Sequence, residues 1–245
     1  MRVITLGSVS TVLDMFDEYT DTQTETADQI QQSFDVSGQN SVVVLNNYGI
    51  TCNLTVTDDD TSTEYFDETV SLIRDNVADW YDYWFAPVRV GRDVVFYFEE
   101  KTNSTAVVTI SYSGGTAKCG MCVPGFATDV GNTNYGLKVG INDYSIIDTN
   151  SFGLTYLSVG TWAKTVDADI NILNAGIDAA QRKFVENIGL AAVFDFNNYD
   201  TDIDTGHTSL DKYQALIAYG YFDSFEPDMD SQVISEASVS VVGMI

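Results

Sequence analysis

The chain has 245 residues, of which 44% are hydrophobic and 12% aromatic, so it is long enough and apolar enough to bury a substantial core. It carries 11 lysines and arginines against 36 aspartates and glutamates, a formal net charge of -25. Because nucleic acids are bound through clustered basic side chains, this balance argues against direct binding of DNA or RNA. No segment has the roughly 18 consecutive apolar residues of a membrane-spanning helix, and the N-terminus lacks a signal-peptide core, so we expect no membrane insertion.

The first half of the chain predicts short antiparallel strands. Residues 1–7 are a first candidate. Four clearer runs of β-branched and aromatic residues, each bounded by Gly, Asn, Asp or Ser, are residues 41–47, 51–58, 93–100 and 106–113. Within the second run, Leu54 and Val56 alternate with polar residues, as in a half-buried strand. This spacing predicts an antiparallel β-sandwich over residues 1–125.

The second half predicts a smaller, β-rich α+β domain over residues 126–245. Glycines among short apolar stretches, from Gly125 to Gly140, indicate an extended connector with turns or bulges. Residues 152–173 are expected to form two strands, and three more are expected at 190–196, 215–222 and 233–245.

One helix is predicted near residues 174–188. Asn174 is a suitable N-cap and Gly189 a suitable terminator. Apolar residues at spacings of three, four and seven define one face: Ile177, Ala180, Phe184, Val185 and Ile188.

The segment Cys119-Gly-Met-Cys122 has the spacing of a zinc or redox motif. A structural zinc site needs four ligands, and the rest of the chain offers only Cys52 and His207. A redox pair of this kind has its first cysteine at a helix N-terminus, whereas the sequence around Cys119 is typical of an extended strand. The preferred interpretation is two small buried side chains on opposite faces of a strand, with no metal or other cofactor.

The acidic runs, at residues 57–61 and 200–204, have two interpretations. A solvated, solubilising surface is preferred, and a calcium site built from loop carboxylates is the second. With His207 as the single histidine and no nucleophile or phosphate-binding motif, we expect no enzymatic activity. A glycosidase active site built from two carboxylates stays open as an alternative. The chain has so many acidic residues that the sequence does not single out any one pair.

An aromatic cluster spans residues 80–85. Its side chains would fill the sandwich core, form a subunit interface, or stack on a sugar. The residues for glycan or interface contacts are Trp80, Tyr83 and Trp84.

Four segments, residues 118–145, 152–170, 215–226 and 238–245, resemble a family of tailed-bacteriophage virion proteins. The matching residues are Cys119, Gly120, Cys122, Gly125, Tyr135, Gly136, Gly140, Asp143, Tyr144, Ser145, Tyr219, Gly220, Tyr221 and Gly243. Residues 42–56 resemble a strand and loop of the galactose-binding, discoidin-like jelly-roll sandwich. The chain departs from the family after Ser145, where neutral and acidic residues replace a usual basic stretch.

This resemblance implies a structural component of a phage tail, in the tail tip, baseplate or adaptor region, assembled in the host cytoplasm. Its partners would be other copies of itself in a symmetric ring and other tail proteins or fibres. Two alternatives of other classes stay open: a carbohydrate-binding module for the host surface, and a hydrolase of cell-wall or capsular polymer.

Overall fold

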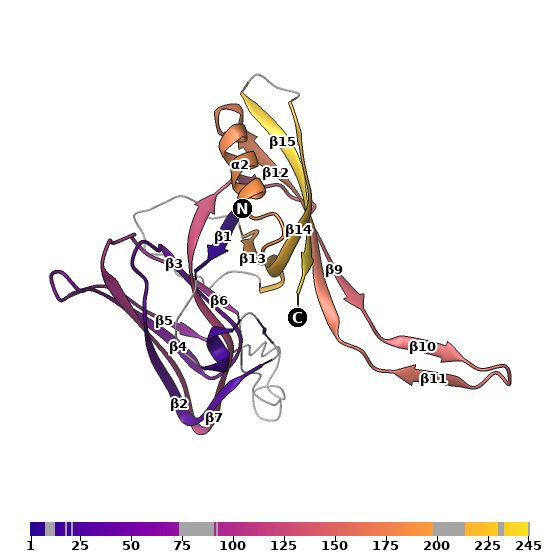
Figure 1. The fold of residues 1–245 in the computed structure, drawn as a ribbon, viewed down its shortest axis with the longest axis horizontal. Helices are drawn as coiled ribbons and strands as arrows, with labels where there is room; N and C mark the ends of the chain where they lie inside the picture. The colour runs from indigo at the N-terminus through magenta and orange to yellow at the C-terminus, as the bar shows by residue number, and fades with distance from the viewer. Residues whose placement is uncertain are drawn as a thin grey trace, which may run out of the picture. The chain divides into compact units, whose positions relative to one another are not determined.

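The chain folds into antiparallel β-sheets (Figure 1). The structure is a computed structural model that describes residues 1–7, 13–17, 19–20, 22–73, 91, 93–197, 214–229 and 233–244. Every strand pair whose register is defined is antiparallel, and the described residues contain one α-helix. The predicted fold class, mainly β with a single helix, is confirmed.

The described residues form two compact units. Among the described residues, the N-terminal unit takes those of 6–127 together with Gln214, and the C-terminal unit takes residues 1–5, 128–197 and those of 215–244. The sequence predicts a single boundary after residue 125. In the structure the main division falls between Ala127 and Thr128, and the first five residues belong to the C-terminal unit.

The N-terminal unit is built from six strands arranged as a β-sandwich. They are β2 (Thr24–Asp35), β3 (Ser41–Tyr48), β4 (Thr51–Asp58), β5 (Thr63–Ser71), β6 (Val94–Tyr97) and β7 (Ser104–Asp129). One layer follows the order β5, β4 and the first half of β7, and the other joins β6, β3 and the second half of β7. Strand β2 pairs along the other edge of β7.

Strand β7 passes from one layer to the other at a corner around Gly114. Gly114 has a φ of +77°, and its N–H donates to the Asp28 carboxylate over 2.8 Å. Asp28 itself has a φ of +64°, and the register between β2 and β7 shifts at this point. Glycine adopts such a backbone at little cost, so the corner is specified locally.

The core of the N-terminal unit comes from alternate residues of the facing strands. Leu54 of β4 lies opposite Val108 of β7, and Val56 lies opposite Ala106; all four are fully buried. Side chains directly opposite on adjacent strands share a face, so each pair extends one apolar surface. The predicted alternation of Leu54 and Val56 is therefore confirmed.

The C-terminal unit is one antiparallel sheet with a helix and an extended hairpin. Its elements are β1 (Arg2–Leu6), β8 (Asn132–Thr133), β9 (Lys138–Asp143), β10 (Ile146–Thr149), β11 (Thr155–Ser158), β12 (Trp162–Leu173), η2 (Asn174–Gly176), α2 (Ile177–Glu186), β13 (Ala192–Asp195), η4 (Gln214–Leu216), β14 (Ile217–Asp228) and β15 (Ile234–Gly243). The strand order is β1, β13, β14, β15, β12, with β8 and β9 on the outer edge of β12.

Helix α2 covers the sheet with three buried residues, Ile177, Ala180 and Phe184. The Phe184 ring stacks on Phe225 with their centroids 4.4 Å apart and meets Phe222 edge-on at 5.2 Å, which anchors the helix to β14.

Two details of the predicted helix are wrong. Asn174 does not cap it: residues 174–176 form a 3-10 turn, Gly176 occupies the N-cap of α2, and the Asn174 side chain accepts from the Ser235 hydroxyl at 2.6 Å. Val185 and Ile188 belong to the predicted apolar face but are 56% and 65% exposed. The helix ends at Glu186, so Ile188 lies in the turn that follows it.

Candidate assembly surface

The aromatic residues predicted to contact glycan or another subunit lie outside the described residues. This applies to Trp80, Tyr83 and Trp84, and also to His207. The interpretations that depend on them stay predictions.

The three cysteines meet in the core of the N-terminal unit. Cys52, Cys119 and Cys122 are all fully buried in one hydrophobic cluster, as free thiols. Burial raises the pKa of Cys119 to about 12 and raises the pKa of the other two as well. Since the thiolate is the reactive form, the Cys-x-x-Cys pair is a packing feature in this environment.

The prediction that Cys119 and Cys122 face opposite sides of their strand is wrong. Between them, the ladder of β3 and β7 lacks the pair of Asn46 with Gly120, and Asn46 has a φ of +48°. A Cβ atom on Gly120 would lie 2.5 Å from the Thr20 carbonyl oxygen, so the strand passes close to another segment there. The alternation of side chains changes phase at this irregularity, which turns both thiols into the same core.

The carboxylates of the acidic run at residues 57–61 hold local turns and cross-chain contacts and form no cation site. In the acidic run at residues 57–61, Asp58 accepts from two backbone N–H groups, Asp59 from the Thr105 hydroxyl at 2.8 Å, and Asp60 from Asn103 at 2.9 Å. Within the described ranges, no group of three or more His, Cys, Asp or Glu side chains could hold a metal ion. In the same part of the chain, no helix is long and apolar enough to cross a membrane.

The most distinctive surface is a two-stranded hairpin, residues 144–161, which we call the arm. Strand β9 pairs with the first half of β12, from Lys138 with Asp167 to Asp143 with Trp162. Beyond that ladder β10 and β11 continue as a separate two-stranded sheet. Figure 1 shows the arm extending away from the remainder of the C-terminal unit.

The base of the arm is a β-bulge that depends on Gly160. Between the ladders, two residues of the outgoing strand face three of the returning strand, because Asp143 pairs with Trp162 and Ile146 with Ser158. The Gly160 N–H donates to the Ser145 hydroxyl at 3.0 Å, and a Cβ on Gly160 would lie 2.4 Å from the Tyr144 carbonyl oxygen. The bulge therefore sets the direction of the arm, and only glycine fits it.

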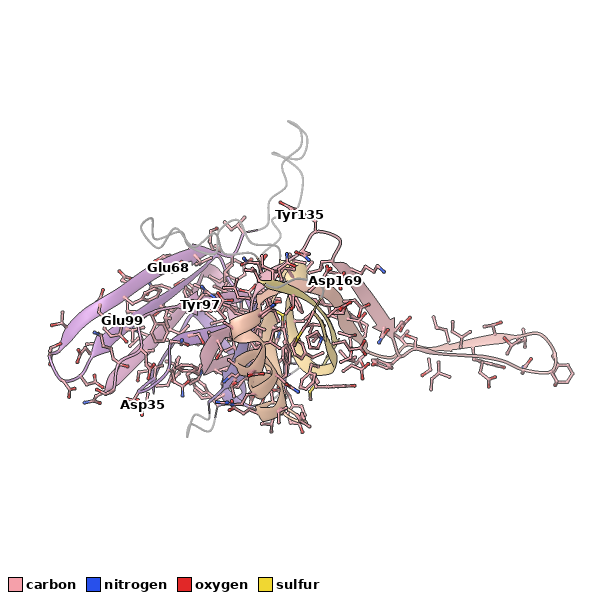
Figure 2. The ribbon with its side chains drawn as sticks, turned by 90° about the horizontal axis from the view of Figure 1, so that it is seen from above. Asp35, Glu68, Tyr97, Glu99, Tyr135 and Asp169 are labelled. Carbon is pink, nitrogen blue, oxygen red and sulfur yellow. The ribbon has the colours of Figure 1, made fainter. Side chains whose placement is uncertain are left out.

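The two faces of the arm differ in chemistry. The register pairs Ile147 with Leu157 on one face, and Asp148 with Tyr156 on the other, where Ile146 also lies. We call the first the aliphatic face and the second the Asp148 face. Every residue of β10 and β11 is exposed, and Figure 2 shows side chains projecting from both faces of the hairpin.

The tip of the arm is an ordered turn that presents an aromatic ring. The Asn150 side chain accepts from the N–H groups of Phe152 and Leu154, both at 3.0 Å, and Gly153 supplies the positive φ of +79°. These bonds define the turn while the Phe152 side chain is 89% exposed.

The arm is almost free of charge in a strongly acidic chain. Its single residue that is charged at neutral pH is Asp148, whereas the whole chain has a net charge of -25. It also exposes eight large hydrophobic side chains, Tyr144, Ile146, Ile147, Phe152, Leu154, Tyr156, Leu157 and Val159, and such concentrations of exposed apolar side chains mark interaction sites. Chemically, the arm is suited to form an interface.

Sequence reasoning found the strands of the arm in part. Residues 152–173 were expected to form two strands, and β11 and β12 are there. The expected connector across residues 125–145 contains β8 and β9 instead. Residues 144 to 161 contain one charged residue, Asp148, but residues 41–57, which form the buried strands β3 and β4, contain none, so low charge alone does not identify the arm.

No protein-family model, no curated protein and no solved structure matches this chain. The resemblance to phage virion proteins therefore stays a prediction, as does the discoidin-like character of the first domain.

Proposed function

We propose that this chain is a structural subunit of a tailed-phage virion, located in the tail tip, baseplate or tail adaptor region. In this role it assembles with copies of itself into a symmetric ring and docks other tail proteins or fibres. The role is one of assembly and requires no catalytic residue.

The arm is the observation that carries this proposal. An isolated two-stranded hairpin is marginally stable in water, and each of its strands leaves one edge without a partner strand among the described residues. Residues such as Ile147 and Leu157 would gain stability only when another surface covers them. A chain with this arm is suited to become part of a larger assembly.

The residues behind the resemblance support the proposal in a structural way. Asp143 accepts from the Ser145 N–H at 2.9 Å, so the Asp-Tyr-Ser segment forms the base of the arm. A Cβ on Gly220 would lie 2.1 Å from the Val242 carbonyl oxygen, so the Tyr-Gly-Tyr segment permits close pairing of β14 and β15. These landmarks shape the unit that bears the arm.

The test is whether the chain is present in particles. Virions produced by the encoding virus should be purified through a density gradient, and their proteins quantified by mass spectrometry relative to a major tail protein. We expect the chain at a fixed, low copy number per particle and expect antibody labelling at one tail position. Its absence from purified virions, while present in the infected-cell lysate, would contradict the proposal.

A further inference from the structure

We infer that the arm of one copy docks through its Asp148 face onto the end of helix α2 in the C-terminal unit of a second copy. This inference rests on the proposed role as an assembling subunit and names the contact that joins neighbouring copies. The acceptor, which we call the α2 patch, consists of Arg182, Val185, Ile188 and Leu190.

The first argument concerns where the exposed apolar side chains lie. In the described part of the N-terminal unit, large exposed hydrophobic residues are few: Tyr19, Tyr48, Ile73 and Phe126. The C-terminal unit carries the arm, the α2 patch, whose three apolar side chains are all more than half exposed, and further exposed apolar side chains such as Ile141, Leu173 and Val233. One unit that bears two such surfaces can cover both by repeating itself, which an unrelated partner for the arm alone would not achieve.

The second argument is the charge of the chain. Two copies with a net charge of -25 repel each other wherever acidic surfaces approach. The arm avoids this repulsion because Asp148 is its only charged residue. Around the α2 patch, Arg182 and the adjacent Lys183 balance the two acids of the helix, Asp178 and Glu186, and the carboxylate of Glu186 is paired with Lys183 at 3.7 Å.

The third argument is the match between the two faces. On the arm, Asp148 lies between Ile146 and Tyr156 on one side of the hairpin. On the helix, residues three apart are neighbours, so Arg182 and Val185 form a row that leads on to Ile188 in the turn beyond it. The arm thus presents one negative charge flanked by apolar groups, and the helix presents the opposite charge, Arg182, beside Val185, with Asp178 and Glu186 one turn away on either side.

The contact must form between copies. In the structure the arm extends away from its own unit, and both the arm and the α2 patch are exposed, so neither covers the other within one chain (Figure 1). An arm that binds a different patch on an identical neighbour makes a heterologous interface, and such interfaces generate rings when the rotation closes.

A charge exchange tests this contact in the full chain. We expect Asp148→Lys and Arg182→Glu each to weaken self-association by about three- to tenfold in sedimentation equilibrium, because each places like charges together. The double variant should recover most of the loss. Glu64→Lys, an exposed change of equal size in the N-terminal unit, is the matched control and should not weaken association.

A cross-link identifies the contact without relying on affinity. A photoreactive phenylalanine analogue at position 152 should, in a mixture of isotopically light and heavy chains, link peptides of opposite label and join the arm tip to residues near 182–190. Links confined to one label, links to another region, a wild-type chain that stays monomeric at its highest soluble concentration, or a double variant no better than the single ones would overturn the inference.

The two proposals fail separately. A chain found in virions whose charge exchange restores nothing would overturn the docking contact and leave the structural role standing. A chain absent from virions whose association is restored by the exchange would do the reverse.

Discussion

Two neighbouring isoleucines on the arm distinguish its two faces. Ile146 and Ile147 are 68% and 69% exposed and lie on opposite faces of the same strand. Replacing either with threonine keeps a β-branched residue of high strand propensity, so the hairpin itself should persist. We expect Ile146→Thr to weaken self-association and Ile147→Thr to leave it nearly unchanged, because only the Asp148 face docks on the α2 patch.

The size of the effect follows from the exposed fraction. Fully burying an isoleucine side chain is worth about 1.5–3 kcal/mol, and about two-thirds of Ile146 remains to be covered, so docking it contributes roughly 1–2 kcal/mol. Threonine forfeits most of this and adds a hydroxyl that needs a partner. The dissociation constant should rise by about five- to thirtyfold.

The assay is sedimentation equilibrium of both variants beside the wild-type chain, with thermal unfolding followed by circular dichroism. Unfolding midpoints should agree among the three proteins, since neither side chain packs in a core cluster. Equal weakening by both substitutions would refute the assignment of the docking face. No weakening by either would refute a role for the arm in self-association.

Three further predictions concern the bulge, the thiols and one carboxylate. Gly160→Ala should distort the base of the arm by forcing a Cβ against the Tyr144 carbonyl, and hydrogen exchange at the Tyr144 amide, which donates to Thr161, should accelerate at least tenfold. The native chain should resist iodoacetamide at pH 8, whereas the unfolded chain should take up three labels. Because burial raises the pKa of Cys119 to about 12, the stability that its neutral thiol contributes is complete below the unfolded thiol pKa of ~8.5 and is lost as the pH rises beyond that value. Carbon-13 NMR should find the pKa of the Asp143 carboxyl below its ordinary value of 3.8, because the Ser145 side chain and N–H donate to the ionised form. The stability that Asp143 gives to the base of the arm is therefore present above pH 3.8 and lost on further acidification, and an unshifted titration would contradict this.

The strands that sequence reasoning found are those with an apolar alternation. The runs at residues 41–47 and 51–58 correspond to β3 and β4, because burial on one face imposes a period of two. Strands β2 and β5 were missed because they are largely exposed, with Ile30 and Phe34 the only fully buried side chains of β2. Their pairing comes from β7 and β4, which local composition does not reveal.

The candidate surface was harder to predict for a related reason. An apolar residue in a strand or helix indicates burial on average, but the arm and the α2 patch place such residues in solvent, as with Val185 and Ile188. Whether an apolar face meets the core depends on tertiary contacts, which the local sequence pattern does not specify. The phase change between Cys119 and Cys122 likewise depends on Asn46, far away in the sequence.

The pairing of β1 with β13 gives the chain an order of events during synthesis. Val3 lies opposite Phe194, so β1 waits for a partner that is synthesised much later, while the described strands of the N-terminal unit find their partners within residues 24–127. About 70 residues, from 127 to 197, separate completion of that unit from arrival of β13, or roughly 4–14 s at ~5–20 residues per second. During that interval Val3 and Ile4, both fully buried in the finished protein, are exposed to chaperones and to other nascent chains. The C-terminal unit therefore cannot be completed before residue 195 has been made, so we expect the N-terminal unit to fold before the unit that bears the arm is complete.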